Sequence, residues 1–375
     1  MNLLDRHIFA SVFFTCAAAV GLFAFVVALP NIVRELIGPL LAGQFSFATF
    51  VRLVALLFPF AISFALPMGI LTGVLLTLGR LSADSEVTAM RASGISVARI
   101  ARPVFVLGAL CALAAFYVNF ESMPWARVQY HRELAGAVRA NPLKIIIPKT
   151  FIRDFSRRVL YVGEKDGVVL RDIWLWELDD QSRVRRLLRA ESGRVDYDEA
   201  TNSLIPSLTG VNVEERDPES PEDFSKAPKV GSFGKSEEIR ISLDSYFGRN
   251  LEKMKDDWLT YDQLRAKAAK LAAEPPPAPD KVQERARDRM KLALIVQEKF
   301  NLSLAVFSFA IIGVPLGIKV SRRETSANLG LALLLVLGFY LSTVVVKSLD
   351  RHPEYRPDLL IWLPNLLFLS LGTWL

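Results

Sequence analysis

The sequence has few of the residues on which metal sites and many enzymes depend. Among its 375 residues there are only two cysteines and three histidines. Cys16 and Cys111 both lie within apolar runs, so we expect neither a disulfide framework nor a thiolate metal site. The histidines, His7, His131 and His352, lack the spacing of a metal-binding or catalytic motif. We therefore predict that the chain holds no metal and no cofactor.

A nucleotide-binding motif is also missing. Gly234-Lys235-Ser236 matches the end of a phosphate-binding loop, but position 229, where that motif requires its first glycine, is a lysine. The sequence has neither a recognisable pair of catalytic carboxylates nor a nucleophile elbow. We predict that the chain is not an enzyme, so that a partner must hydrolyse ATP if ATP drives its activity.

Long apolar runs dominate both ends of the chain. Hydrophobic residues make up 51% of the sequence, too many for one soluble domain, whereas the middle is too charged for a membrane. The first run has 22 residues, more than the about 7–15 of a signal-peptide core, so we expect an uncleaved helix. We predict six transmembrane helices, at about 8–29, 50–78, 100–120, 300–318, 329–346 and 359–375. After the first, we expect Gly38-Pro39 to break any continuing helix.

The region between the third and fourth runs alternates between apolar and polar residues. Short strand-like segments surround turns such as Asp166-Gly167, which favours an inserted all-β, jelly-roll-like domain. Residues 216–235 are rich in Pro, Glu, Ser and Lys, and we expect a mobile loop there. The predicted boundaries are 1–120 and 290–375 for the two membrane parts and 121–289 for the β domain with its flanking helices and Pro-rich linker. After the β domain we expect a helix at 256–273 and a charged helix at 280–299.

Basic residues are biased toward one end of the predicted spans. This bias places both termini in the cytoplasm and the β domain in the periplasm. The net charge of +6 suits an anionic partner or membrane surface, and no nucleic-acid motif accompanies it. Two small-residue pairs, Gly69 with Gly73 and Gly313 with Gly317, predict close packing between helices.

A short polar segment, at about 80–96, separates the second run from the third. Its apolar residues can share one side of a helix, which predicts an amphipathic helix along the membrane surface; they are Leu81, Val87, Met90 and Ile95. Its charged residues are Arg80, Asp84, Glu86 and Arg91. Such a helix is either an ordinary connector or a docking element. Glu86 is either a solvated charge or a carboxylate that accepts charge-assisted hydrogen bonds from a partner.

Three stretches resemble the lipopolysaccharide export permeases, the LptF/LptG (YjgP/YjgQ) family. They are residues 78–96, the run Phe-Ala-Ile-Ile-Gly-Val-Pro-Leu-Gly at 309–317 with Arg322-Arg323 behind it, and Trp-Leu-Pro-Asn at 362–365. The resemblance covers both membrane halves, whereas the middle matches only in layout. One junction departs from it: Gln297-Glu298-Lys299-Phe300 and Ser303 stand where many relatives carry His-basic-basic-Phe and a proline.

This resemblance implies a permease subunit of an ATP-binding-cassette exporter that extracts lipopolysaccharide from the inner membrane. Its implied partners are a paralogous permease subunit in a heterodimer, a cytoplasmic ATPase dimer and periplasmic jelly-roll bridge proteins. Segment 80–96 would then dock on the ATPase through Glu86, with Arg80, Asp84 and Arg91 beside it. The local sequence around Arg34, at 85–88 and at the C-terminus is more similar to the LptF branch than to the LptG branch.

Several residues are candidates for lipid contact. Arg34 follows the first run, where it either anchors the helix end or binds lipid phosphate, and Lys347 and Arg351 repeat the pattern after the fifth. In the β domain, we expect one apolar face to meet acyl chains, with Leu160, Val162, Val168 and Leu170. A membrane-anchored periplasmic scaffold or sensor is the alternative function. A secondary transporter is disfavoured because no acid or base lies near a span's midplane.

Overall fold

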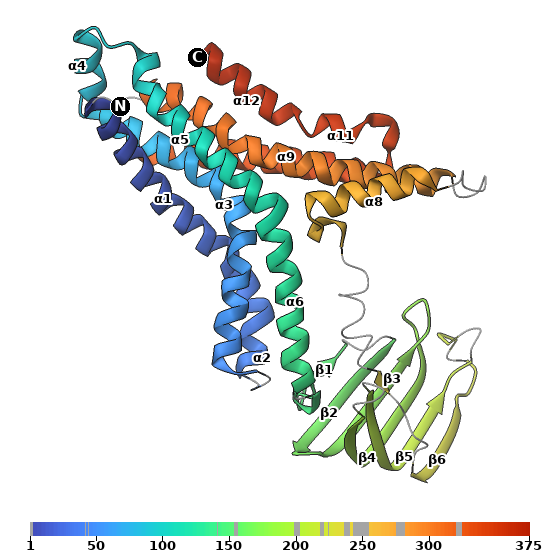
Figure 1. The fold of residues 1–375 in the computed structure, drawn as a ribbon. Coiled ribbons are helices and arrows are strands. Elements are labelled where there is room, and N and C mark those ends of the chain that lie inside the picture. The colour runs from blue at the N-terminus through green and yellow to red at the C-terminus, as the bar shows by residue number, and fades with distance from the viewer. Residues whose placement is uncertain are drawn as a thin grey trace. The chain divides into compact units, whose positions relative to one another are not determined.

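The chain forms two compact units, which we call the helical unit and the β unit. The structure, a computed structural model, describes residues 3–41, 43, 45–140, 142–153, 157–198, 203–217, 221–223, 225–235, 241–242, 255–274, 282–319 and 325–375. The helical unit comprises Met1–Arg34, Val54–Gln129 and Lys255–Leu375 (Figure 1). The β unit comprises Glu35–Leu53 and Tyr130–Met254. The predicted domain boundaries stay predictions.

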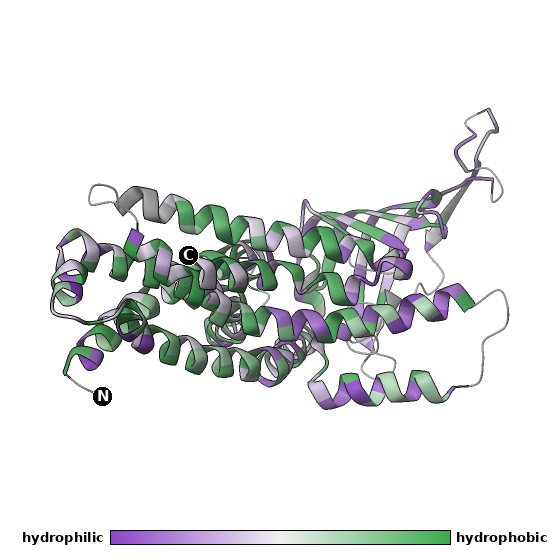
Figure 2. Cartoon of the chain, turned by 90° about the horizontal axis from the view of Figure 1, so that it is seen from above, coloured by the Kyte–Doolittle hydropathy of each residue, from purple (hydrophilic) through white to green (hydrophobic). Residues whose placement is uncertain are grey.

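Long apolar helices build the helical unit. They are α1 (Leu3–Asn31), α3 (Phe47–Ala83), α5 (Val97–Tyr117), α9 (Val282–Lys319) and α10 (Thr325–Ser348). The π-helical turn η1 (Ile32–Ile37) continues α1 into α2 (Gly38–Leu41), and the π-helical turn η2 (Val118–Ser122) continues α5 into α6 (Met123–Ala140). Figure 2 shows hydrophobic residues along most of the long helices. Five helices of the described chain are long and apolar enough to cross a membrane.

The sixth predicted span is interrupted. Residues 359–375 form α11 (Pro357–Leu360) and α12 (Leu363–Trp374), with a break at Ile361-Trp362. Pro364 lies in the first turn of α12, where its missing amide costs nothing, but its ring is incompatible with a helix that continues from the preceding turn. The 12 residues of α12 are fewer than the about 20 that cross a bilayer. The expectation of one continuous helix here was wrong.

The expected helix break at Gly38-Pro39 was also wrong. The helix runs through Pro30 and the turn η1 to Leu41. A π-helical turn shifts the hydrogen-bond register by one residue, so a proline that lacks an amide donor is accommodated more easily nearby. The helix that carries Arg34 is therefore continuous on both sides of it.

Glycines let helices of this unit approach at backbone distance. A methyl group added at Gly73 would lie 2.6 Å from Cys16 Cα on α1, and one at Gly69 would lie 2.6 Å from Val20 N. On α9, a methyl group at Gly317 would lie 2.9 Å from Leu78 Cβ of α3. Both predicted glycine pairs are confirmed as close-packing positions. They hold α1 and α9 against α3.

A helical hairpin leads from the β unit back to the membrane. It consists of η4 (Asp256–Trp258), α8 (Tyr261–Ala273) and the first turns of α9. Thr260 and Gln263 form a capping box at the start of α8. Leu264 of α8 packs against Leu292 and Ile295 of α9. The predicted helix at 256–273 and charged helix at 280–299 are thus confirmed in outline, whereas the proline linker at 275–279 lies outside the described residues.

One antiparallel sheet forms the β unit, in the order β1-β2-β3-β4-β5-β6, with β7 also on β5. The strands are β1 (Phe151–Ile152), β2 (Arg158–Asp166), β3 (Val169–Leu178), β4 (Val184–Asp198), β5 (Ser203–Glu215), β6 (Lys229–Lys235) and β7 (Ile241–Ser242). The predicted Asp166-Gly167 turn is present, and Gly167 has φ +61°. An inserted β domain is confirmed. A jelly roll needs a second sheet, which the described strands do not form, so that detail stays a prediction.

The two faces of this sheet differ in burial. Leu160, Leu175, Leu188 and Val213 are in register across four strands and lie in one buried cluster. Ile146, next to the 3₁₀ turn η3 (Pro142–Ile145), packs into the same cluster.

Lys165 Nζ donates to the carbonyl oxygens of Leu143 and Ile146 at 2.5 and 3.1 Å. Burial, aided by nearby Lys144, lowers the pKa of Lys165.

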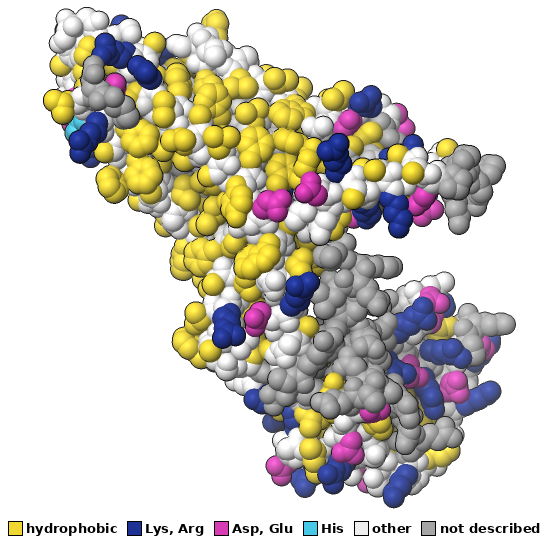
Figure 3. Space-filling view, in the orientation of Figure 1, with side chains coloured by type: hydrophobic (Ala, Val, Ile, Leu, Met, Phe, Trp, Pro, Cys, Tyr) yellow, Lys and Arg dark blue, Asp and Glu magenta, His cyan; other side chains and the backbone are white. Residues whose placement is uncertain are grey.

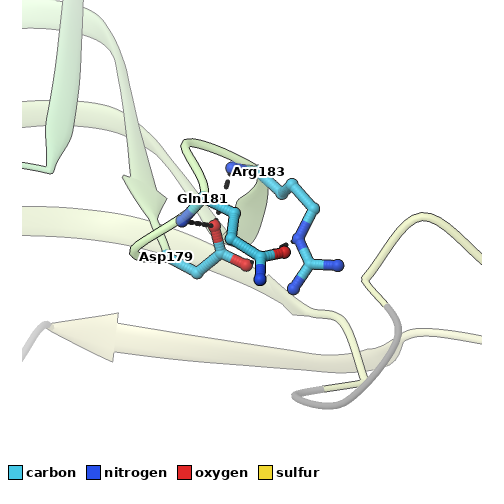
Figure 4. Close-up of polar contacts among 3 residues, drawn as sticks. All are labelled: Asp179, Gln181 and Arg183. Atoms are coloured by element: carbon cyan, nitrogen blue, oxygen red, sulfur yellow. Dashed lines mark hydrogen bonds and ion pairs between the residues drawn. The ribbon is translucent and has the colours of Figure 1, made fainter. Parts of the chain in front are cut away.

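A tight hairpin joins β3 to β4 (Figure 4). The Asp179 carboxylate accepts hydrogen bonds from the amides of Gln181 and Arg183 at 2.9 and 2.8 Å, and from Arg183 Nε at 2.7 Å. The Arg183 amide is the largest cause that lowers the pKa of Asp179, and the Arg183 guanidinium and the Gln181 amide act in the same direction.

The loop expected at 216–235 contains a strand instead. Lys229–Lys235 pairs with β5, whose Val211 and Val213 would otherwise lie beside a sheet edge. This pairing outweighs the polar local composition, as tertiary contacts commonly do for strands. Gly234 and Lys235 are therefore strand residues, which fits the rejection of a phosphate-binding loop.

Candidate functional site

The polar segment between α3 and α5 forms a compact turn at one end of the helices. α3 ends at Ala83, and Ser85 takes a left-handed conformation with φ +63°. The helix α4 (Glu86–Ala92) follows, and the segment closes at Gly94, with φ +84°. The two bends turn the chain back toward the membrane, because a left-handed residue reverses its direction without a long loop. The predicted amphipathic helix is thus one end of α3 plus the separate helix α4.

The predicted apolar side of this segment packs onto the helices. Leu81 and Val87 are 2% and 3% exposed, and Met90 and Ile95 contact the same cluster, which also contains Ile8, Ile100 and Val314. Ser82 Oγ donates to the Ile318 carbonyl of α9 at 3.0 Å. The segment is therefore fixed to α1, α5 and α9 rather than hanging free.

The charged side of the segment faces outward. The side chains of Arg80, Asp84, Glu86 and Arg91 are all exposed. Glu86 is the first residue of α4, where the partial positive charge of the helix end favours a carboxylate. Figure 3 shows apolar side chains over most of the visible face of the helices, with Lys and Arg gathered at the end where α4 lies. The segment therefore has one side packed on the helices and one exposed, charged side.

Arg34 and Lys347 differ in their surroundings. Arg34 lies on η1, and its side chain is exposed. Lys347, in the last turn of α10, makes an ion pair with Glu298 of α9, with Nζ 2.8 Å from Oε2. Arg351 ends the turn η6 (Leu349–Arg351), which follows α10, and its side chain lies outside the described residues. The predicted lipid-contact role stays a prediction for all three.

The four β-domain candidates are not equally accessible. Leu160, Val162 and Leu170 are 5%, 0% and 2% exposed and belong to the buried cluster of the sheet. Val168 lies in the β2–β3 turn and is half-buried. The alternation of the strands was predicted correctly, because these residues share one face. Acyl chains could reach the first three side chains only if that cluster opened.

Comparison with known proteins connects this geometry to one family. Residues 6–375 match the family described as the lipopolysaccharide export system permease LptF/LptG. The chain belongs to the LptF/LptG family. It is also similar to the lipopolysaccharide export system permease protein LptF of Escherichia coli strain K12, at 23% identity over 314 residues, 82% of this chain and 76% of that protein. The LptF of Shigella flexneri matches with the same identity and coverage.

Membership of the LptF/LptG family determines the class of activity. The chain is a lipopolysaccharide export permease, and a permease subunit transports rather than catalyses. It is a multi-pass membrane protein of the inner membrane and a member of the Lpt transporter complex. The expected absence of a cofactor and a metal stays a prediction.

A buried polar cluster escaped the sequence analysis. Lys299 on α9 is 7% exposed, and its Nζ donates to the Asn119 carbonyl at 2.9 Å. Asn119 Nδ2 donates to Ser303 Oγ at 2.9 Å, and Ser63 of α3 donates to Asn119 Oδ1. A usable signal was present, because polar residues inside predicted spans often have a function. Asn119 lies within the third predicted span, and Lys299 immediately precedes the fourth.

The junction that departs from the family pattern is fully engaged in contacts. Gln297 accepts a hydrogen bond from Trp362 Nε1 at 3.0 Å, and Glu298 pairs with Lys347. Ser303 links Asn119 to the Lys299 carbonyl, to which its hydroxyl donates at 2.8 Å. These residues connect α9 to α12, α10 and η2. The departure therefore coincides with a contact hub.

Proposed function

We propose that this chain is an LptF-type subunit that pairs with a paralogous permease and docks on a cytoplasmic ATPase dimer through α4. The observation that carries the proposal is the two-sided packing of the segment at 80–96. Its apolar side chains are held by three helices, whereas its four charged side chains are exposed. A rigid helix with a free charged face can transmit force from an ATPase, which a flexible connector cannot. Glu86 is the residue we assign to the contact, with Arg80, Asp84 and Arg91 around it.

The proposed orientation has both termini and α4 in the cytoplasm and the β unit in the periplasm. The positive-inside bias of the sequence supports it. Three crossings precede the insert, so three must follow it if both termini are to lie in the cytoplasm. Because α9 and α10 supply two of these, α11 and α12 together would form the third. Their combined length and their apolar composition are compatible with that role.

The proposed lipid entry lies beside α1 and α10. Both helices keep large apolar side chains exposed, such as Phe14 at 71%, Leu22 at 62% and Leu334 at 66%. These faces suit contact with acyl chains and with a second permease subunit. Arg34 supplies an exposed guanidinium for a lipid phosphate, and Lys347 in the last turn of α10 and Arg351 just after it add positive charge. From there, lipid would pass to the β unit and on to periplasmic jelly-roll proteins.

The remaining alternative is a membrane-anchored periplasmic scaffold. A scaffold needs the β unit, but it needs neither a fixed charged segment between α3 and α5 nor backbone-close packing at Gly69 and Gly73. Both features are expected of a transporter whose helices move as rigid bodies.

Affinity purification of the tagged chain from its native membrane tests the proposal. We expect an ATPase and a second permease to co-elute in fixed stoichiometry. Purification of a truncated protein that comprises only Tyr130–Met254, the long segment of the β unit, gives the matched comparison, because it should retain periplasmic partners and lose the ATPase. A full-length preparation with periplasmic partners but no ATPase would support the scaffold instead.

A further inference from the structure

The two chain segments that lead to and from the long insert of the β unit, Tyr130–Met254, meet at Lys299. The outgoing segment passes through η2, where the Asn119 carbonyl accepts a hydrogen bond from Lys299 Nζ at 2.9 Å. The returning segment enters α8 just after Leu259, whose carbonyl accepts from the same Nζ at 3.4 Å. One buried ammonium group thus bridges both connections and anchors them to α9.

An independent set of ring contacts joins the same three segments. Phe120 of η2, Tyr261 at the start of α8 and Phe300 of α9 form a cluster. The Phe120 and Phe300 ring centroids are 4.8 Å apart, and the Phe120 and Tyr261 centroids are 5.5 Å apart with their planes nearly perpendicular. Aromatic pairs of this kind prefer edge-to-face arrangements and add to the stability of the contact. The rings therefore form a second contact among the segments that Lys299 joins.

The outgoing segment is also tied to α3. The Asn119 side chain accepts a hydrogen bond from Ser63 of α3 and donates one to Ser303 of α9. These three residues are at most 2% exposed, so their hydrogen bonds do not compete with water. They meet at a π-helical turn, a feature that recurs at functional sites in helices. A movement between α3 and α9 would therefore be felt directly at the start of the outgoing segment.

Stability alone is a weak reason for a lysine at this position. A buried ammonium group loses its hydration, and an apolar side chain of similar volume often serves the fold as well or better. The group is useful when two carbonyls on separate segments must be held at one point, because one ammonium can donate to several acceptors. The lysine then serves to hold two chain segments in position rather than to stabilise the fold.

We propose that Lys299 is a positioning residue that holds the outgoing and returning connections of the β unit together and so couples movement of the helices to lipid transfer. This inference rests on the proposed function. The alternative role for a lysine in a lipid exporter is a direct bond to lipid phosphate. The side chain is 7% exposed and donates to two main-chain carbonyls, which favours positioning.

The test combines a distance measurement with a coupling measurement on the complete complex. Cys16 and Cys111 are first replaced by serine so that they are not labelled. Spin labels at the exposed positions Trp125 on α6 and Ala268 on α8 then report the distance between the two connections. Lys299→Met is the test variant, and Lys291→Met, an exposed lysine on the same helix, is the matched control. Lys299→Arg tests rescue by a side chain that keeps the charge.

We expect the distance distribution to broaden in Lys299→Met and to stay narrow in Lys291→Met. We expect ATP hydrolysis to continue while lipid captured in the β unit per ATP falls about tenfold, as for loss of one charged hydrogen bond, with recovery in Lys299→Arg. Tyr261→Leu should broaden the same distribution, and it replaces Lys299→Met as the test if that variant does not accumulate.

Two results would overturn the inference. One is an unchanged distance distribution with unchanged lipid capture per ATP in both Lys299→Met and Tyr261→Leu. The other is an unchanged distribution with loss of lipid that co-purifies without ATP, which would make Lys299 a lipid ligand. Absence of ATP-dependent lipid capture in the unsubstituted protein would instead contradict the proposed function, and the spin-label distances would still decide the positioning role.

Discussion

Glu86 is the residue at which a coupling element and a simple connector differ most. Its carboxylate is exposed here, as it must be to meet a partner. Truncating one member of a charge pair that becomes buried in an interface costs about 2–5 kcal/mol, whereas an exposed pair contributes about 0–1 kcal/mol. The same residue thus gives very different outcomes under the two interpretations.

We predict that Glu86→Ala leaves the chain folded and inserted but weakens ATPase co-purification strongly and abolishes export. Asp84→Ala is the matched control, because Asp84 is equally exposed and lies just before α4. It should reduce co-purification by less than about fivefold, in keeping with an exposed charge. Normal export and normal ATPase recovery with Glu86→Ala would show that Glu86 is only a solvated charge.

At the scale of elements, contact between α1 and α3 depends on the absence of a side chain. A methyl group at Gly73 would lie 2.6 Å from Cys16 Cα, and the obstacle is backbone, which cannot rotate away. Gly73→Ala should therefore destabilise the helical unit by about 1–3 kcal/mol through overpacking. Thermal unfolding in detergent measures the effect, and Gly21→Ala on α1, where the added methyl group meets nothing within 4 Å, should be neutral. Equal melting temperatures for all three proteins would refute the close approach.

The β3–β4 hairpin should respond to pH through Asp179. Its pKa is lowered in the folded state, chiefly by the Arg183 amide, so its hydrogen bonds contribute fully above the ordinary carboxyl pKa of about 3.9 and are lost as the pH falls through the folded value. The protection of the Arg183 amide from hydrogen exchange, relative to the intrinsic rate at each pH, should therefore fall at low pH. Asp179→Asn should remove that pH dependence while it keeps an acceptor. In Asp179→Ala the Arg183 amide should be unprotected at every pH. Slow exchange in Asp179→Ala would mean that the carboxylate does not hold the turn.

The elements that could be predicted from sequence are those set by local spacing. The apolar residues of segment 80–96 follow helical spacing, and they do pack on one side, as Leu81 and Val87 show. The glycine pairs and the Asp166-Gly167 turn were likewise visible, because small residues and turn residues act through their own backbone. Each of these signals lies within a few residues of its effect.

The elements that could not be predicted depend on distant partners. The segment that forms β6 is polar in composition, and it is a strand because it pairs with β5. The Lys299 cluster joins residues 180 positions apart in the chain, so the sequence could mark Asn119 and Lys299 as polar residues in or beside predicted spans but could not show that they meet. The helix continues through Pro39, which follows a π-helical turn, whereas it is interrupted just before Pro364. Local spacing thus predicted the packing of segment 80–96 but not the Lys299 cluster.

At the scale of the whole molecule, we propose one path for force and one for lipid. Force would enter at the charged face of α4, pass through the helices that pack on Leu81 and Val87, and reach the connections of the β unit at Lys299. Lipid would enter beside α1 and α10 and leave through the β unit. α3 and α9, which belong to the proposed path of force, are in contact at Gly317 and through the hydrogen bonds of Asn119 with Ser63 and Ser303.

The central claim is that ATP hydrolysis by a partner drives lipopolysaccharide through this chain. Its most direct test is a photo-reactive residue at Val168, the most accessible of the four β-domain candidates, in proteoliposomes with the full complex and lipopolysaccharide. We predict lipid adducts that appear with ATP, are absent without it and disappear in the Glu86→Ala protein. Adducts that form equally without ATP, or no adducts although the assembled complex hydrolyses ATP, would contradict it.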